Sequence, residues 1–212
     1  MFRVTGKADE RIAFLVDLLD NPKDEVDGAL AVLALTDPVT RVALGQIRAM
    51  PDADVYHGPY ASLIMLPFLR PFRARFNDTT FGAWYAADDQ TTAYYEKRFH
   101  LIRWLSNSRG KPYELWQRIV SANLTAPLLH VRRGEVPDEV YDPDPDHYAA
   151  ANTLAREVRA NGAHGLLYDS VRRHGFACVA IFRPSIISDI MIERDLRLEW
   201  DGDDLRGFTA IA

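Results

Sequence analysis

The apolar residues that follow Pro51 occur in short runs separated by Gly, Pro and Asp. Short apolar or aromatic runs between such breakers are typical of strands joined by loops. This pattern therefore predicts a domain in which small sheets supply much of the core. The candidate strands are residues 54–57, 83–87, 128–131, 165–168 and 177–182.

Two longer stretches between these runs predict helices. Residues 88–105 open with Asp88 and Asp89, which can cap a helix N-terminus, and residues 146–162 close on Asn161-Gly162, a usual helix stop. Residues 142–146, with the sequence DPDPD, predict a rigid acidic loop. Strands and helices do not alternate regularly, and neither GxGxxG nor GxxxxGK[ST] occurs, so we predict an α+β fold rather than a doubly wound one.

The first fifty residues have a different pattern. In residues 8–20 the apolar side chains recur at spacings of three and four, as in an amphipathic helix. Residues 22–37 and 38–50 each begin with proline, which suits the first turn of a helix. The 212 residues allow one sizeable core. We therefore predict a helical extension over residues 1–50 and one domain over residues 51–212.

Charge and composition argue against several classes of protein. A net charge of -5 disfavours binding to nucleic acid through many phosphate contacts. No apolar run approaches the ~18 residues of a membrane-spanning helix, and charges interrupt the apolar residues of the N-terminus, unlike a signal peptide. The single cysteine, Cys178, lies in the apolar run FACVAIF and has no intramolecular disulfide partner. We expect a cytoplasmic protein without membrane or direct nucleic-acid contacts.

Few residues carry an obvious chemical signal. The six histidines are scattered, and HExxH, paired CxxC and GxSxG are absent, so we predict neither a metal site nor a serine nucleophile. Glu96 remains, in the predicted helix 88–105, on a face that also carries Phe99 and Arg103. Together, this carboxylate, an aromatic strand end and an arginine have the ingredients of a site for an anionic, ring-bearing ligand. The alternative is a solvated pair between Glu96 and Arg103 or Lys97.

Residues 75–100, RFNDTTFGAWYAADDQTTAYYEKRFH, resemble the core motif of the RES-domain family. That motif has an Arg-Phe pair, a Gly-rich turn, a strand Tyr and a Glu eleven residues later, as here. Other segments resemble the family in the same order, so that the resemblance spans residues 54–202. They are YHGPYASLIMLPF at 56–68, LLHVRRG at 128–134, DHYAAANTLAREVRANGAHGLLYDSVR at 146–172, FACVAIFRP at 176–184 and LEWDG at 198–202.

The resemblance implies a fold similar to ADP-ribosyltransferases of the diphtheria-toxin kind, with small mixed or antiparallel sheets and flanking helices. It implies a toxin that depletes NAD by cleaving the nicotinamide glycosidic bond, with phosphate or water as acceptor. Its partner would be a Xre-type helix-turn-helix antitoxin, through which it could also form oligomers. Two alternatives stay open: transfer of ADP-ribose to a protein, and a catalytically impaired domain that only binds the antitoxin.

The resemblance also implies a site. Arg75 matches the family arginine and suits the NAD pyrophosphate. Tyr85 matches the strand tyrosine, whose ring can stack on nicotinamide. Glu96 matches the family glutamate, which can stabilise positive charge on the ribose.

Three further residues complete the expected site. His57 stands where some members have an arginine, and it could bond a ribose hydroxyl or phosphate. The start of the helix after the Asp-Tyr pair, where the resemblance implies the family serine, is Ala149-Ala150-Ala151 here. The nearest serine is Ser170, and we expect it to line the pocket, with Arg172 beside it to help bind phosphate. The resemblance therefore implies NAD as substrate, inorganic phosphate as one of the candidate co-substrates, and no metal.

Overall fold

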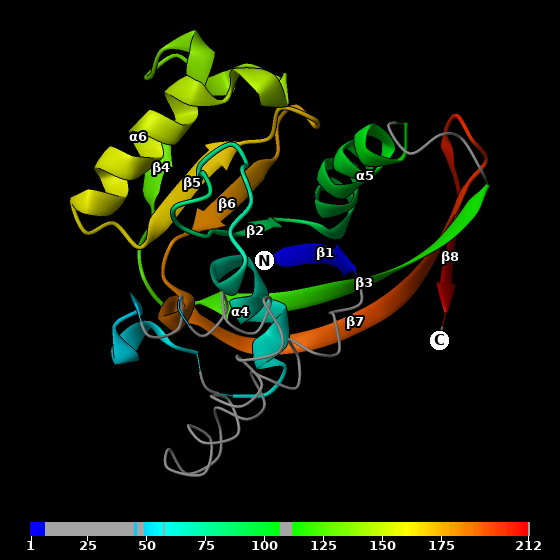
Figure 1. Ribbon diagram of the computed structural model, residues 1–212, viewed down its shortest axis with the longest axis horizontal. Helices are drawn as coiled ribbons and strands as arrows, with labels where there is room; N and C mark the ends of the chain where they lie inside the picture. The colour runs from blue at the N-terminus through cyan, green and yellow to red at the C-terminus, as the bar shows by residue number, and fades with distance from the viewer. Residues whose placement is uncertain (7–44, 46–48, 57, 107–111, 212) are drawn as a thin grey trace.

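The structure is a computed structural model that describes residues 1–6, 45, 49–56, 58–106 and 112–211. In this part of the chain eight strands form one sheet in the order β4-β5-β6-β2-β1-β3-β7-β8 (Figure 1). Neighbouring strands are antiparallel except for the parallel pair β4 and β5. The strands are β1 (Phe2–Gly6), β2 (Trp84–Ala87), β3 (Tyr113–Leu124), β4 (Leu129–Val131), β5 (Gly165–Asp169), β6 (Ala177–Ile181), β7 (Ile187–Trp200) and β8 (Leu205–Ile211).

Helices cover both faces of this sheet. Because side chains alternate along a strand, Trp84 and Ala86 of β2 pack in a cluster with α4, whereas Ala87 packs in the cluster of α5 and α6. The α-helices are α4 (Ala61–Leu69), α5 (Gln90–Ser106) and α6 (Ala149–Ala160), and the short 3-10 helices are η1 (Asp52–Asp54), η2 (Asp138–Tyr141), η3 (Pro145–His147) and η4 (Pro184–Ile186). Within the described residues, no helix has the length and apolar character needed to cross a bilayer.

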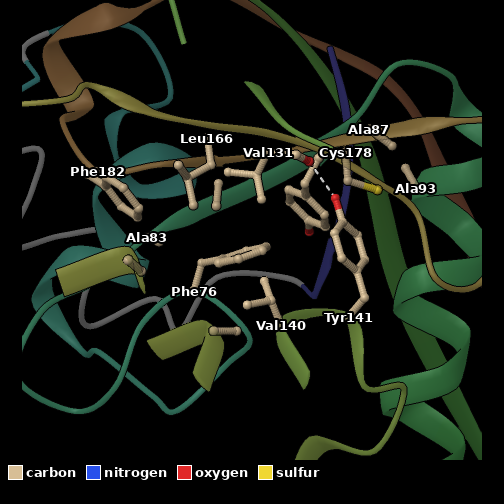
Figure 2. Close-up of a cluster of buried hydrophobic side chains, with 14 of the residues drawn as sticks. Phe76, Ala83, Ala87, Ala93, Val131, Val140, Tyr141, Leu166, Cys178 and Phe182 are labelled. Carbon is tan, nitrogen blue, oxygen red and sulfur yellow. Dashed lines mark hydrogen bonds between the residues drawn. The ribbon is translucent and has the colours of Figure 1, made fainter. Parts of the chain in front are cut away.

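The core on the α5 and α6 face anchors the segment that leads into β2. Figure 2 shows Phe76 among Val140, Leu166 and other buried side chains. The Phe76 ring is fully buried and meets the Tyr168 ring edge-on, with centroids 4.7 Å apart. Tyr141 spans this cluster and donates a hydrogen bond to the Val131 carbonyl (Figure 2). Residues on either side of Phe76 are therefore held against the sheet.

The α+β class predicted from the sequence is confirmed. The predicted strands at 83–87, 128–131, 165–168 and 177–182 correspond to β2, β4, β5 and β6. The predicted helices at 88–105 and 146–162 correspond to α5 and α6, the second of which begins only at Ala149 because η3 precedes it.

Two local predictions are wrong. Residues 54–57 do not begin a strand, because the Asp54 N–H bonds the Pro51 carbonyl at 2.8 Å and closes the 3-10 turn of η1. The helical extension predicted over residues 1–50 does not begin at the N-terminus, because residues 2–6 form β1 inside the sheet. Phe2 and Val4 pack into the core while Arg3 and Thr5 alternate with them, as a strand requires. The three helices predicted over residues 8–50 lie largely outside the described residues.

Candidate active site

A cavity of about 330 Å³ opens where the sheet divides between β1 and β2. These strands pair only at Phe2 and Ala87, whereas β1 pairs along its whole length with β3 on its other side. The cavity is lined by residues 2–4 of β1, residues 85–87 of β2, one side of α5 and residues 72–75. Its volume lies within the roughly 300–1,000 Å³ of small-molecule sites.

Glu96 extends from α5 into this cavity. Its Oε1 atom accepts a hydrogen bond from the Ser170 hydroxyl at 2.6 Å and lies 3.8 Å from the Cys178 sulfur. Burial, with Glu96 close by, raises the pKa of the Cys178 thiol, which therefore stays protonated. The Oε2 atom has no hydrogen bond to any described residue. One carboxylate oxygen is thus fixed and the other remains available to a ligand.

Ser170 is oriented by the turn that follows β5. Its hydroxyl oxygen accepts the backbone N–H groups of Arg172 and Arg173 at 3.2 and 3.0 Å. A hydroxyl has one proton to donate, and here it goes to Glu96. Because Ser170 is only 5% exposed, water competes little for this bond. The serine therefore acts as a rigid support for the carboxylate.

The N-terminus of α5 is tied to the same turn. The Asp89 carboxylate accepts the N–H groups of Thr91 and Thr92 at 2.9 and 3.1 Å, which caps the helix. The Arg173 guanidinium pairs with Asp89 at 2.8 Å and also donates to the Thr92 hydroxyl. The helix that carries Glu96 and the turn that carries Ser170 are therefore held together at two points.

Arg75 brings a buried positive charge to the cavity. It is 5% exposed, donates to the Val140 carbonyl at 2.9 Å, and lies over the Tyr148 ring with 4.5 Å between guanidinium and centroid. Among the described residues no carboxylate pairs with it. A guanidinium held in this way favours an anionic ligand, because its charge is desolvated but not neutralised.

Tyr85 presents its ring rather than its hydroxyl to the cavity. The hydroxyl donates to the Asn77 side-chain oxygen at 2.8 Å and accepts the Phe76 N–H at 2.9 Å. Burial raises the pKa of Tyr85, so the phenol stays neutral. Both polar functions of the phenol are occupied by the loop, and the ring is left to contact a ligand.

The other predicted site residues differ in their placement. His57 lies outside the described residues. The Arg172 side chain lies outside this cavity, stacked on the Phe99 ring at 3.4 Å and donating to the Pro143 carbonyl. Ala151, in the first turn of α6, is fully buried in the core. The hydroxyl that contacts Glu96 is therefore supplied by Ser170 and not from the start of α6.

Several cavity residues had no signal in the sequence. Lys97 and His100 line the cavity from α5, and Tyr148 lines it from the residue before α6. Burial, with the charge of Arg3 nearby, lowers the pKa of Lys97 to about 8. His100 is exposed, and partial desolvation together with neighbouring cations, Arg172 first, lowers the pKa of its imidazole. Within the described residues no cluster of His, Cys, Asp or Glu could hold a metal ion.

A carboxylate, an arginine without a carboxylate partner among the described residues and an aromatic ring line one cavity of this α+β domain. Together they form a site suited to an anionic, ring-bearing small molecule. A family model of the RES domain matches residues 48–201, most of the chain, and the chain therefore belongs to the RES-domain family. In general this domain is found in NAD-acting toxins of toxin–antitoxin systems. Among curated proteins, none matches the chain. The cavity is not built from the matched residues alone, because residues 2–4 of β1, which lie before residue 48, also line it.

Proposed function

We propose that this protein is the toxin of a toxin–antitoxin system and that it depletes NAD by cleaving the nicotinamide glycosidic bond. The observation that carries the proposal is the 2.6 Å bond from Ser170 to Glu96, which lines one cavity together with Arg75 and Tyr85. Membership of the RES-domain family supports NAD as the substrate.

The chemistry needs little from the protein beyond charge and position. When the C–N bond breaks, its electron pair stays on the pyridinium nitrogen, so nicotinamide leaves as a neutral molecule and no acid is required. Positive charge develops on the ribose, where the open oxygen of Glu96 stabilises it. Arg75 holds the pyrophosphate, and the Tyr85 ring packs against nicotinamide. The acceptor then bonds to the anomeric carbon: a phosphate oxyanion needs to lose no proton, whereas water passes a proton to the Glu96 carboxylate, which returns it to solvent.

The partner in this proposal is a Xre-type helix-turn-helix antitoxin that covers the cavity. An active NAD-consuming enzyme has to be held inactive until it is needed. Covering a single cavity on one face of the sheet achieves this without unfolding the toxin.

The test is nicotinamide release by the purified protein incubated with NAD, with and without phosphate. We expect turnover by the wild type and a loss of roughly 100- to 1,000-fold in Glu96→Gln, which keeps the shape of the side chain but not its charge. Glu157→Gln, on the exposed side of α6, is the matched control and should be fully active. An inactive wild type, or an active Glu96→Gln variant, would contradict the proposal.

The same samples distinguish the two alternatives. With NAD labelled in the ADP-ribose part, label that stays on a cellular protein would identify a transferase. A domain that only binds the antitoxin would release no nicotinamide, and cells would tolerate its expression without the partner.

A further inference from the structure

The entrance of the cavity carries an exposed aromatic ring. Phe72 lines the cavity and its side chain is 55% exposed. Its backbone is nevertheless anchored, because the Phe72 carbonyl accepts a hydrogen bond from the buried Asn77 amide at 2.7 Å. A large apolar ring held at the entrance of a ligand cavity is suited to stacking on a flat ring system. The proposed function leaves the adenine ring of the dinucleotide without a contact, and Phe72 is placed to supply one.

Arg73, the next residue, brings a positive charge to the same entrance. It is exposed, lines the cavity, and donates a long hydrogen bond of 3.4 Å to the Asp146 backbone carbonyl. The Asp146 carboxylate is paired with Arg103 at 2.8 Å, and among the described residues no carboxylate pairs with Arg73. In the proposed function the pyrophosphate is held by Arg75, two residues further along this loop. The Arg73 guanidinium is therefore open to a second anionic group.

The charge of the cavity lining exceeds what NAD needs. The cations that line the cavity are Arg3, Arg73, Arg75 and Lys97. Glu96 is the only acid among the described residues that line it, so four cations and one carboxylate leave three positive charges in excess. In NAD the positive nicotinamide ring offsets part of the pyrophosphate charge, and about one negative charge remains. A phosphate monoester adds close to two more at pH 7. A dinucleotide with one further phosphate group therefore matches this lining better than NAD does.

We propose that Phe72 and Arg73 form a subsite for 2′-phosphorylated adenosine, so that the enzyme cleaves NADP in preference to NAD. This inference rests on the proposed function and adds the substrate class. The Phe72 ring stacks on adenine, and the Arg73 guanidinium pairs with the 2′-phosphate. The bond that breaks is the same in both dinucleotides, because the 2′-phosphate is attached to the ribose that bears adenine.

The reason for the preference is electrostatic. In many dinucleotide sites a carboxylate binds the 2′-hydroxyl of NAD and repels a 2′-phosphate, whereas an arginine in that place accommodates the phosphate of NADP. Here the charged residue that the described chain supplies at the entrance is Arg73. The carboxylate of the lining, Glu96, comes from α5 and acts on the other ribose in the proposed function.

The experiment measures nicotinamide release from NAD and from NADP by the wild type, Arg73→Gln, Arg73→Lys and the control Arg70→Gln. Arg70 is also exposed, directly follows α4 and does not line the cavity. In wild type we expect kcat/KM for NADP to exceed that for NAD roughly tenfold or more. In Arg73→Gln the KM for NADP should rise roughly 10- to 100-fold, the loss of one charge-assisted bond, with the KM for NAD within about twofold of wild type. Arg73→Lys should keep part of the preference, and Arg70→Gln all of it.

Phe72→Ala tests the stacking contact. We expect the KM values for NAD and NADP to rise together by roughly 5- to 100-fold, the loss of one base on an aromatic ring. The KM for nicotinamide mononucleotide, which has no adenine, should change less than about twofold. Phe72→Trp should restore the affinity for both dinucleotides. An equal effect of Phe72→Ala on the mononucleotide would refute the contact with adenine.

Binding without turnover separates this inference from the proposed function. Calorimetry compares adenosine 2′,5′-bisphosphate with adenosine 5′-monophosphate. If wild type binds the bisphosphate more tightly and Arg73→Gln loses this difference, the subsite is supported even when no dinucleotide is cleaved. If wild type cleaves NAD but uses NADP no better, the preference is refuted while the proposed function stands. An equal rise of both KM values in Arg73→Gln would also overturn the inference, because Arg73 would then hold the pyrophosphate.

Discussion

At the scale of single residues, the site depends on which hydrogen bonds the Ser170 and Tyr85 hydroxyls donate and accept. Ser170 accepts two backbone N–H groups, which leaves its own proton for Glu96. Tyr85 accepts one N–H and donates to Asn77. Neither hydroxyl is free to act on a substrate, so both are positioning groups for the residues that contact it.

Removing the Ser170 hydroxyl should leave Glu96 in place but less well oriented. We expect Ser170→Ala to lower kcat for nicotinamide release by roughly tenfold, the equivalent of one hydrogen bond to a charged group, with little change in the KM for NAD. Steady-state kinetics measure both constants. Ser185→Ala is the control, because the Ser185 hydroxyl also bonds a carboxylate, that of Asp54 at 3.1 Å, but lies on an exposed surface. Equal effects of the two substitutions would show that Ser170 has no special role.

The Tyr85 ring and hydroxyl can be separated by substitution. Tyr85→Phe keeps the ring but leaves the Phe76 N–H without an acceptor, so we expect the free energy of unfolding to fall by about 1–3 kcal/mol while turnover of NAD changes little. Tyr85→Ala should in addition raise the KM for NAD. Urea denaturation and steady-state kinetics measure the two effects. A large loss of kcat in Tyr85→Phe would mean that the hydroxyl takes part in the chemistry.

At the scale of elements, α6 positions Arg75 through one buried side chain. The Asn152 amide lies within hydrogen-bonding distance of three carbonyls, those of Ala74 and Arg75 at 2.7 Å and that of Asn77 at 3.3 Å. Asn152 is 5% exposed, so these carbonyls have little access to water. A helix distant in the sequence thus fixes the loop before β2.

Asn152→Ala should therefore weaken both folding and NAD binding. We expect the free energy of unfolding to fall by about 1–3 kcal/mol, because buried carbonyls lose their donor, and the KM for NAD to rise because Arg75 is less well held. Thermal unfolding and kinetics measure the two effects. Thr153→Ala is the control, since the exposed Thr153 hydroxyl bonds only the Ala149 carbonyl of its own helix and the Arg156 side chain. An unchanged KM for NAD would show that Asn152 does not influence ligand binding through Arg75.

The elements also show which parts of the fold a sequence can predict. β2, β5 and β6 are short apolar runs between loops and were predicted. β7 was not, because charged residues such as Arg194, Asp195 and Arg197 interrupt its apolar residues. In the structure these charges find partners across the strand pair: Asp195 pairs with Arg118 of β3 at 2.6 Å, and Arg197 lies 3.9 Å from Glu114 of β3. Cross-strand ion pairs become visible only when the partner strand is known.

In the site, too, contacts between segments distant in the sequence could not be predicted. Arg75, Tyr85 and Glu96 were predicted because they belong to one motif, and the structure brings all three to one cavity. Lys97 and Tyr148 were not, because their approach to the cavity depends on how α5 and the start of α6 pack. Ser170 was predicted to line the pocket, and this is wrong: it is buried beside the cavity and supports Glu96 through a bond that spans 74 residues, for which the sequence has no local signal.

At the scale of the whole molecule, β1 connects the two parts of the sheet. It lies between β2 and β3, and through β2 it adjoins the strands that carry Tyr168 and Cys178. β1 is paired along its whole length with β3 and at one position with β2, whereas the edge strand β8 is paired only with β7.

Hydrogen exchange should show this difference. We expect the backbone amides of β1 that bond β3 to exchange as slowly as those of the central residues of β3, because both open only when the sheet unfolds, and those of β8 to exchange faster. Mass spectrometry of peptic peptides measures the rates. Fast exchange in β1 would mean that the N-terminal strand opens independently of the sheet.

The pairing of β1 with β3 has a consequence for synthesis on the ribosome. Phe2 pairs with Ser121 and Gly6 with Gln117, so β1 leaves the exit tunnel and then waits for a partner strand made more than a hundred residues later. The turn with Ser170 emerges later still. A nascent or truncated chain that ends before this turn has Glu96 but not its support. On the proposed function, a nascent chain therefore gains the support of its catalytic carboxylate only after the turn with Ser170 has been made.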